Sequence, residues 1–204
     1  MSLDFLKDVP AFKDLVLAIK TGEQGLRISG LAAPAKPYFF SMLAQNVPKR
    51  IVHIQPAALS LQEFEERCRF FLAELGSSKE VLALPPLTDN PFEETGPSLE
   101  AASTRMKFYY GLVYGSPALV VTNLFGLLKP FPAPHRLPRL FLRLEKNSFY
   151  ERDRLLQTLA QYGYVREDLV SFRGEYAGRG GIVDVFSPWN DTPYRIEYSG
   201  DEIV

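Results

Sequence analysis

The chain has 204 residues, of which 46% are hydrophobic and 13% aromatic, so it can build one large hydrophobic core or two smaller ones. Its 23 Lys and Arg residues are balanced by 24 Asp and Glu residues, which excludes the overall positive charge that is typical of many nucleic-acid-binding proteins. The single cysteine, Cys68, excludes an internal disulfide framework, and no apolar run is long enough to span a membrane.

The N-terminus lacks the pattern of a signal peptide, so we expect a soluble, cytoplasmic protein. Cys68 shares helical spacing with Phe64 and Phe71, which favours a small, buried and unreactive side chain. The two histidines, His53 and His135, have no cysteines or carboxylates near them at the spacing of metal ligands. We therefore expect no metal site and no cofactor.

Strands and helices alternate over the first part of the chain. The expected helices cover residues 10–20, 34–45, 60 onward and 98–114, and the expected strands cover 25–29, 50–55, 80–84 and 118–122. Ser60 precedes Glu63 by three positions, which is the spacing of a capping box. The alternation predicts an α/β domain at residues 1–128, with a parallel sheet covered by helices on both faces.

Residues 129–138 contain four prolines and no periodicity, so we expect an interdomain linker there. After it the pattern predicts a strand at 139–144, a helix opened by Ser148 and Glu151 and ended by Gly163, and a strand at 164–170. Residues 172–202 predict a β-meander with strands around 175–177, 182–186 and 194–198. Residues 139–204 are thus predicted to form a small α+β domain with an antiparallel sheet and one helix.

Arginine replaces lysine in the second part of the chain. Before Pro130 there are eight Lys and five Arg, and from Pro130 onward there are one Lys and nine Arg. Arginine is preferred where a planar cation pairs with carboxylates across a desolvated interface. Strict alternation places Arg195 and Ser199 on one face of the last predicted strand and Tyr198 on the other. On pattern alone a solvated sheet face with incidental arginines is the favoured interpretation, and a contact surface is the alternative.

Three closely spaced sequence motifs resemble those of a known protein family. They are R-G-E-Y-A-x-R-G-G, D-V-F and R-I-E-x-x-G-D-E, within RGEYAGRGGIVDVFSP and PYRIEYSGDEI. They resemble the second domain of the transcription-repair coupling factors (Mfd) and of the excision-repair protein UvrB, which docks UvrA in both families. The resemblance implies a UvrA-docking domain at 139–204, with the family's contacting arginines at Arg179 and Arg195. An aromatic position of the family falls on Ser199, and the neighbouring Tyr198 is the candidate to replace it.

The turn at residues 30–37 (GLAAPAKP) resembles a phosphate loop that has lost its chemistry. A working loop reads G-x-x-x-x-G-K-[ST], and its glycines let backbone N–H groups converge on phosphate oxygens. Here Gly30 and Lys36 remain, Ala35 replaces the second glycine, and Pro37 removes both a backbone donor and the hydroxyl that would hold magnesium. We expect a degenerate, RecA-like loop with no nucleotide binding and no catalytic residue, and an ordinary strand-to-helix turn leads to the same expectation.

The same loop separates the two families, because UvrB keeps an intact phosphate loop and an aromatic-rich hairpin. Here the connection from residue 84 to residue 98 is short and has one aromatic residue, Phe92. The resemblance is therefore to the N-terminal, UvrB-like region of the coupling factors. It implies an N-terminal fragment that acts as a non-enzymatic adaptor and recruits UvrA for nucleotide excision repair. ATP-dependent translocation, RNA polymerase binding and double-stranded DNA binding would belong to other domains of the longer protein.

Two other functions remain open from the residues alone. A UvrB-like scaffold could bind DNA directly, stacking bases and contacting phosphates through Arg105, Lys107, Phe108, Tyr109 and Tyr110. The helical spacing of Met106, Tyr109, Tyr110 and Val113 favours a buried face instead. A residual nucleotide hydrolase is supported only by Lys36.

Overall fold

The computed structural model of the chain describes residues 3–86, 99–128 and 130–204. The chain divides into two units, of which unit 1 comprises Met1–Pro97 and Lys107–Pro132 and unit 2 comprises Ser98–Met106 and Ala133–Val204. The predicted linker at 129–138 contains one boundary between the units, whereas the first turns of a helix group with unit 2, which the sequence did not predict. The separate domains at 1–128 and 139–204 stay a prediction.

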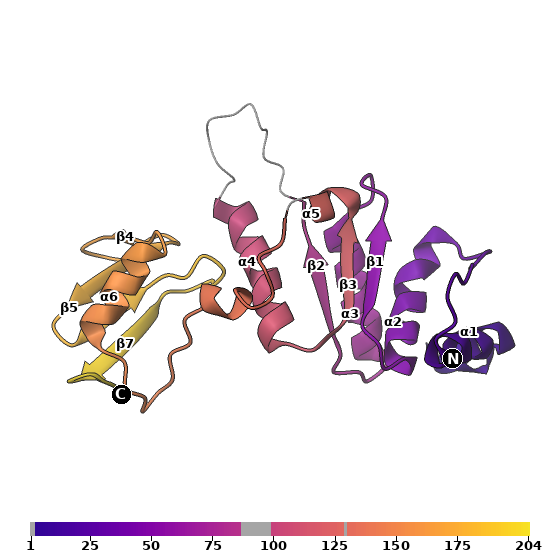
Figure 1. Cartoon of the computed structure of the whole chain (residues 1–204), viewed down its shortest axis with the longest axis horizontal. Helices are drawn as coiled ribbons and strands as arrows, with labels where there is room; N and C mark the ends of the chain where they lie inside the picture. The colour runs from indigo at the N-terminus through magenta and orange to yellow at the C-terminus, as the bar shows by residue number, and fades with distance from the viewer. Residues whose placement is uncertain (1–2, 87–98, 129) are drawn as a thin grey trace. The chain divides into compact units, whose positions relative to one another are not determined.

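Unit 1 is built on a parallel sheet of three strands in the order β1-β3-β2 (Figure 1). The strands are β1 (Ile51–Gln55), β2 (Glu80–Leu84) and β3 (Pro117–Asn123). The longer helices around it are α1 (Pro10–Thr21), α2 (Lys36–Asn46), α3 (Leu61–Glu74) and α4 (Leu99–Tyr114). Shorter ones are the 3-10 helices η1 (Leu3–Asp8) and η2 (Ala33–Ala35) and the helix α5 (Leu124–Leu128).

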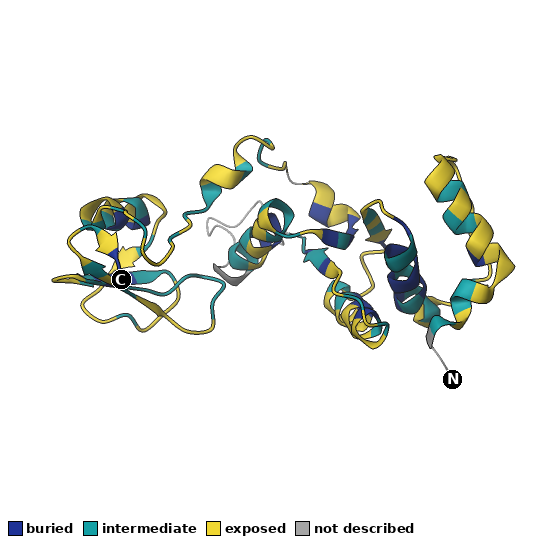
Figure 2. Cartoon of the chain, turned by 90° about the horizontal axis from the view of Figure 1, so that it is seen from below, coloured by how far each residue is buried: buried dark blue, intermediate teal, exposed yellow. Residues whose placement is uncertain are grey.

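Helices lie on both faces of this sheet, as predicted, but the second face is covered only in part, since Val52 and Ile54 of β1 are 56% and 54% exposed. Helices α2 and α3 pack on one face through a core that includes Ala44, Phe64, Cys68 and Leu72 with Val81, Leu119 and Val121 of the strands. On the other face Gly111 of α4 approaches Leu82 so closely that an added Cβ would lie 2.8 Å from its Cδ1. The buried residues of unit 1 are concentrated in α2 and β3, while most of α1 is exposed (Figure 2). The α/β class is confirmed.

One predicted strand of unit 1 is absent. Residues 25–29 are irregular and pair with no described strand, and Leu26 and Ile28 remain 38% and 48% exposed beside α1. A β-type pattern becomes a strand only when a partner strand lies next to it, which the local sequence does not reveal. The N-cap half of the predicted capping box is confirmed, since the hydroxyl of Ser60 accepts a hydrogen bond from the N–H of Glu63 at 3.1 Å, while the carboxylate of Glu63 accepts from Arg67.

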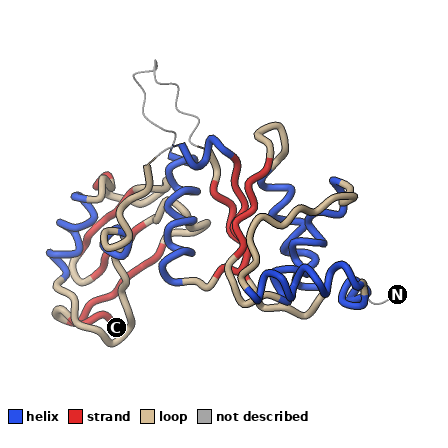
Figure 3. Tube along the Cα trace, turned by 45° about the vertical axis from the view of Figure 1, so that its right-hand side comes forward, coloured by secondary structure: helices blue, strands red, loops and turns tan. Residues whose placement is uncertain are grey.

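Unit 2 contains a five-stranded sheet in the order β4-β5-β6-β7-β8. Its elements are β4 (Val165–Arg166), β5 (Glu175–Arg179), β6 (Ile182–Val185), β7 (Tyr194–Ser199) and β8 (Glu202–Ile203), with α6 (Arg152–Gln161) and the 3-10 helix η3 (Leu137–Leu140). Helix α6 lies along one face of the strands (Figures 1 and 3), and its Leu155 and Leu159 pack with Tyr176 and Val183 in the core. The small α+β class is confirmed, with one difference: β4 pairs parallel to β5, so the sheet is mixed.

Two local predictions in unit 2 are wrong. Residues 139–144 form no strand, because η3 ends at Leu140 and the following residues pack on the core from an irregular segment. Helix α6 begins at Arg152, and its N-cap residue Glu151 makes no side-chain cap, so Ser148 and Glu151 do not form a capping box. Ser148 pairs through its backbone with β8 instead, since the N–H of Ile203 donates to its carbonyl. The predicted helix stop at Gly163, with φ of 84°, is confirmed.

Within the described ranges, no helix combines the length and the hydropathy needed to cross a bilayer.

Candidate interaction surface

The sheet of unit 2 has one face packed against α6 and one open face. The pairing register joins Arg179 to Ile182 and Ile182 to Glu197, and it joins Asp184 to Arg195. Directly paired residues project from the same side of a sheet, and so do alternate residues along a strand. Ala177, which pairs with Asp184, lies on this side but is buried. We call the accessible side chains on this side the open face: Arg179, Ile182, Asp184, Arg195, Glu197 and Ser199.

Tyr198 lies on the opposite side from Ser199. It is half-buried and packs against the core under α6, together with Ile196. Its side chain therefore does not share the open face with the two arginines. The replacement of an aromatic contact at Ser199 by Tyr198 stays a prediction, which this placement on the other side of the sheet does not favour.

Two polar residues of the motifs that carry the resemblance, Arg173 and Glu175, hold loops of unit 2 together. The guanidinium of Arg173 donates from Nε to the carbonyl of Asn190 at 2.8 Å and from Nη2 to Oδ1 of Asp191 at 2.9 Å. The carboxylate of Glu175 accepts hydrogen bonds at 2.8 Å from the backbone N–H groups of Ser171 and Phe172. These two residues are thus explained by the fold.

The glycines of the same motifs are explained by close packing. A Cβ at Gly178 would lie 3.1 Å from side-chain atoms of Arg152 and Leu156, and one at Gly181 would lie 2.9 Å from the backbone oxygen of Tyr198. At Gly181 another backbone therefore approaches too closely for a side chain. Arg179 and Arg195 remain as exposed charged side chains whose positions the packing of the core does not explain.

Arg195 is held from one side by Asp184. Its Nε donates to Oδ1 of Asp184 at 2.8 Å and its Nη2 donates to Oδ2 at 3.0 Å. These hydrogen bonds from Arg195 lower the pKa of Asp184 below its ordinary value, against the opposing effect of burial. The side chain of Arg195 is 61% exposed, and its Nη1 has no hydrogen-bond partner within the described residues. The guanidinium is therefore fixed along one edge and open along another.

Arg179 is the last residue of β5, and its side chain is exposed. Its Nη2 donates to the backbone carbonyl of Asp168, in the loop that follows β4. The positive charge of Arg179 also contributes to the lowered pKa of Asp184, but less than Arg195 does. The two arginines predicted from the sequence are thus brought onto one face with a carboxylate between them, and the sequence had not predicted that carboxylate.

The turn at residues 30–37 has a geometry unlike that of a phosphate-binding loop. The N–H of Ala35 donates to the carbonyl of Ala32 at 3.0 Å, and the N–H of Lys36 donates to the carbonyl of Ala33, so both donors are used inside the turn. Pro37 is buried near the start of α2 and offers no N–H.

His53 of β1 is partly buried near this turn. Burial, with a smaller contribution from the Lys36 ammonium, lowers the pKa of His53 to about 4. The prediction that the connection from residue 84 to residue 98, which contains Phe92, has no aromatic-rich hairpin lies outside the described residues.

The aromatic and basic run of α4 is largely buried. Arg105, Phe108 and Tyr109 are 5%, 4% and 5% exposed, whereas Tyr110 is 45% exposed and Lys107 is also exposed. The predicted burial is confirmed for Tyr109, is partial for Met106 and Val113, and is wrong for Tyr110, which the helical spacing had placed on the buried side. A stacking platform for bases needs several accessible aromatic rings, and in this run only the ring of Tyr110 is exposed.

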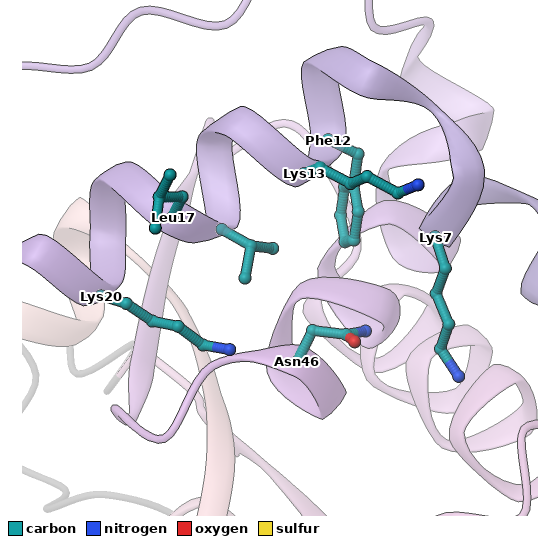
Figure 4. Close-up of a pocket in the computed structure, with 7 residues that line it drawn as sticks. Lys7, Phe12, Lys13, Leu17, Lys20 and Asn46 are labelled. Carbon is teal, nitrogen blue, oxygen red and sulfur yellow. The ribbon is translucent and has the colours of Figure 1, made fainter.

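A second polar feature lies in unit 1, where a hollow of about 240 Å³ is lined by Lys7, Lys13 and Lys20 (Figure 4). In this view the three ammonium groups lie on different sides of Asn46. Lys7 and Lys13 pair with Asp4 and Asp8 at 3.0 and 3.9 Å, so much of the positive charge is neutralised locally. No group of three or more His, Cys, Asp or Glu in the described part of the chain is placed to hold a metal ion.

Residues 142–204, which include the whole open face, match the family model described as the UvrB interaction domain. This part of unit 2 is thus similar to the UvrB interaction domain. The chain is also similar to the transcription-repair-coupling factor of Bacillus subtilis, with 26% identity over 201 residues, 98% of this chain and 17% of the relative. For that of Myxococcus xanthus the identity is 29% over 196 residues, 94% of this chain and 16% of the relative.

The UvrABC system protein B of Chlorobium limicola is 23% identical over 202 residues, which covers 95% of this chain and 30% of that protein. The resemblance inferred from the sequence motifs is therefore confirmed, both for the UvrB interaction domain and for the coupling factors. The chain spans about one sixth of the length of the coupling factors that it matches.

Proposed function

We propose that this chain is an adaptor that docks UvrA through the open face of its UvrB interaction domain, in transcription-coupled nucleotide excision repair. The observation that carries the proposal is the pair of exposed arginines, Arg179 and Arg195, on one face of the matched domain. The similar proteins are named for coupling transcription to repair and for the UvrABC system, which supports the same pathway.

The chemistry of Arg195 supports a docking role. A guanidinium that is already oriented loses less conformational entropy when a partner carboxylate binds it, because fewer rotamers remain to be frozen. Asp184 holds Nε and Nη2, and the outer edge of the guanidinium remains for a second acceptor. We infer that the partner surface presents acidic groups to Arg179 and Arg195.

We propose further that the chain has no nucleotide hydrolysis of its own. The N–H groups of Ala35 and Lys36 are used within their turn and Pro37 has none, so charge-assisted hydrogen bonds to phosphate are missing. Binding of RNA polymerase and of double-stranded DNA is assigned to other parts of a longer protein of the coupling-factor type.

The proposal is tested by titrating UvrA with the purified chain in a calorimeter, beside Arg179→Ala and Arg195→Ala. We expect each substitution to weaken binding by about tenfold or more, as for arginines near the centre of an interface. The matched control is Arg166→Ala: this exposed arginine of β4 pairs with Tyr176 and so projects from the α6 side. Arg166→Ala is expected to bind as the parent does.

Circular dichroism and thermal melting establish that the variants fold before binding is compared. Failure of the parent chain to bind UvrA, or equal loss of affinity in all three variants, would contradict docking through the open face. A steep salt dependence of DNA binding, together with no binding to UvrA, would favour the scaffold function instead.

A further inference from the structure

Phe149 is the most exposed large apolar side chain of the described residues, at 77% exposure. It precedes α6 and forms an isolated antiparallel bridge with Glu202 of β8. An aromatic ring left in water costs free energy that burial against a partner recovers. The position of Phe149 in the sheet decides which partner could cover it.

The backbone pairing places Phe149 on the open side of the sheet. The N–H of Tyr150 donates to the carbonyl of Asp201 at 3.0 Å, and the N–H of Ile203 donates to the carbonyl of Ser148 at 3.0 Å. These two bonds flank the Phe149 and Glu202 pair, whose side chains therefore project from the same side and lie close together.

Glu202 pairs in turn with Ser199 of β7. Ser199, Glu202 and Phe149 thus form one row across the sheet, on the side that carries the open face. Neighbouring strands lie about 4.8 Å apart, so the backbone of Phe149 is about 10 Å from that of Ser199. Phe149 extends the open face at its β8 edge.

The next residue gives an independent indication of the same orientation. Tyr150 packs against the core under α6, and its hydroxyl lies 3.3 Å from the hydroxyl of Thr158 on that helix. Because consecutive side chains in extended backbone project to opposite sides, Phe149 points away from α6. Both arguments place the ring on the side of Arg179 and Arg195.

We propose that Phe149 is the apolar anchor of the UvrA-docking surface, inserted into an apolar depression beside the acidic groups that accept from the two arginines. This inference rests on the proposed function. The occupant is UvrA because the ring is continuous with the arginine-bearing face and lies inside the matched interaction domain. An aromatic residue beside exposed arginines is the composition that dominates binding energy in protein interfaces.

The experiment compares UvrA binding by the parent chain, Phe149→Ala, Phe149→Leu and Arg195→Ala. We expect Phe149→Ala to weaken binding by about tenfold and Phe149→Leu to weaken it less, because leucine keeps part of the apolar area. The matched control is Phe70→Ala, which removes a ring that is 56% exposed on α3 in unit 1. This control is expected to bind within about twofold of the parent.

Two further readouts separate an apolar contact from a charged one. Phe149→Ala is expected to make the heat-capacity change of binding less negative, since less apolar surface is buried, and to leave the salt dependence unchanged. Arg195→Ala is expected to reduce the salt dependence.

Binding by Phe149→Ala that equals the parent's, beside weakened binding by Arg195→Ala, overturns the anchor and leaves the proposed function standing. No binding by the parent overturns both. Sedimentation of the parent as a dimer and of Phe149→Ala as a monomer, with unchanged affinity for UvrA, makes a second copy of the chain the occupant and also overturns the proposal.

Discussion

At the scale of single residues, the pair formed by Asp184 and Arg195 shows what alternation along one strand can and cannot predict. The pattern of β7 was sufficient to separate Arg195 and Ser199 from Tyr198, because the side-chain period of a strand is two. The partner of Arg195 comes from β6, eleven positions earlier in the chain. A contact across strands depends on register, which the residues of either strand alone do not specify.

The ion pair predicts a pH dependence of stability. The hydrogen bonds from Arg195 lower the pKa of Asp184 in the folded chain, so the carboxylate stabilises the fold above its ordinary, unfolded pKa. The stabilisation is lost as the pH falls through the lowered pKa. Asp184→Asn is therefore expected to be slightly less stable than the parent at pH 7, and the difference is expected to vanish at strongly acidic pH.

Urea unfolding of parent and Asp184→Asn at several pH values, followed by the fluorescence of Trp189, measures this difference. Thr192→Ala serves as the control, because Thr192 is exposed and lies outside the ion pair. A difference between parent and Asp184→Asn that is the same at every pH would show that the charge of Asp184 is not its cause.

At the scale of secondary-structure elements, the two capping-box predictions had opposite outcomes. The N-cap bond at Ser60 formed because α3 begins there, whereas the same spacing at Ser148 failed because that segment pairs with β8. Tertiary pairing outweighed a local preference that is worth about 1 kcal/mol. Short-range patterns predicted a helix end well where no strand competed for the backbone, as at Gly163.

Gly181 directly precedes β6 and pairs through its backbone with Tyr198 of β7, and we expect this position to tolerate no side chain. An alanine Cβ would lie 2.9 Å from the backbone oxygen of Tyr198, while the N–H of Tyr198 donates to the carbonyl of Gly181 at 2.8 Å. Because a backbone atom rather than a flexible side chain is in the way, the strands must shift. Gly181→Ala is expected to cost about 1–3 kcal/mol in the free energy of unfolding, measured by urea titration.

Thr192→Ala, in the loop that joins the same two strands, is the control for that measurement and is expected to be nearly neutral. Equal stability of Gly181→Ala and the parent would mean that the strands relax around the added methyl group without loss of pairing.

At the scale of the whole molecule, unit 1 and unit 2 have separate cores. The core of unit 1 contains Cys68, and the core of unit 2 is formed by α6 and its own sheet. The single cysteine therefore reports on unit 1, and the single tryptophan, Trp189, reports on unit 2, where its ring lies 6.1 Å from that of Phe141. The sequence places a distinct natural probe in each unit.

We expect the two probes to report different unfolding transitions. Burial raises the pKa of the Cys68 thiol to about 12, so native protein should react very slowly with a thiol reagent at neutral pH. Pulse labelling of Cys68 across a urea series, beside Trp189 fluorescence, gives the two midpoints. Midpoints that coincide would show that the units unfold as one cooperative body.

The sequence by itself determined the order of most helices and strands, the α/β and α+β classes, and the arginines of the open face. The elements and the fold classes follow from periodicity and turn residues, which act over a few positions along the chain, whereas Arg179 and Arg195 were implied by the resemblance of the sequence motifs. Only the tertiary structure decided that residues 25–29 have no strand partner, that β4 runs parallel to β5, and that Phe149 shares a row with Ser199. Each of these depends on register between segments distant in sequence, and register is set by packing rather than by local preference.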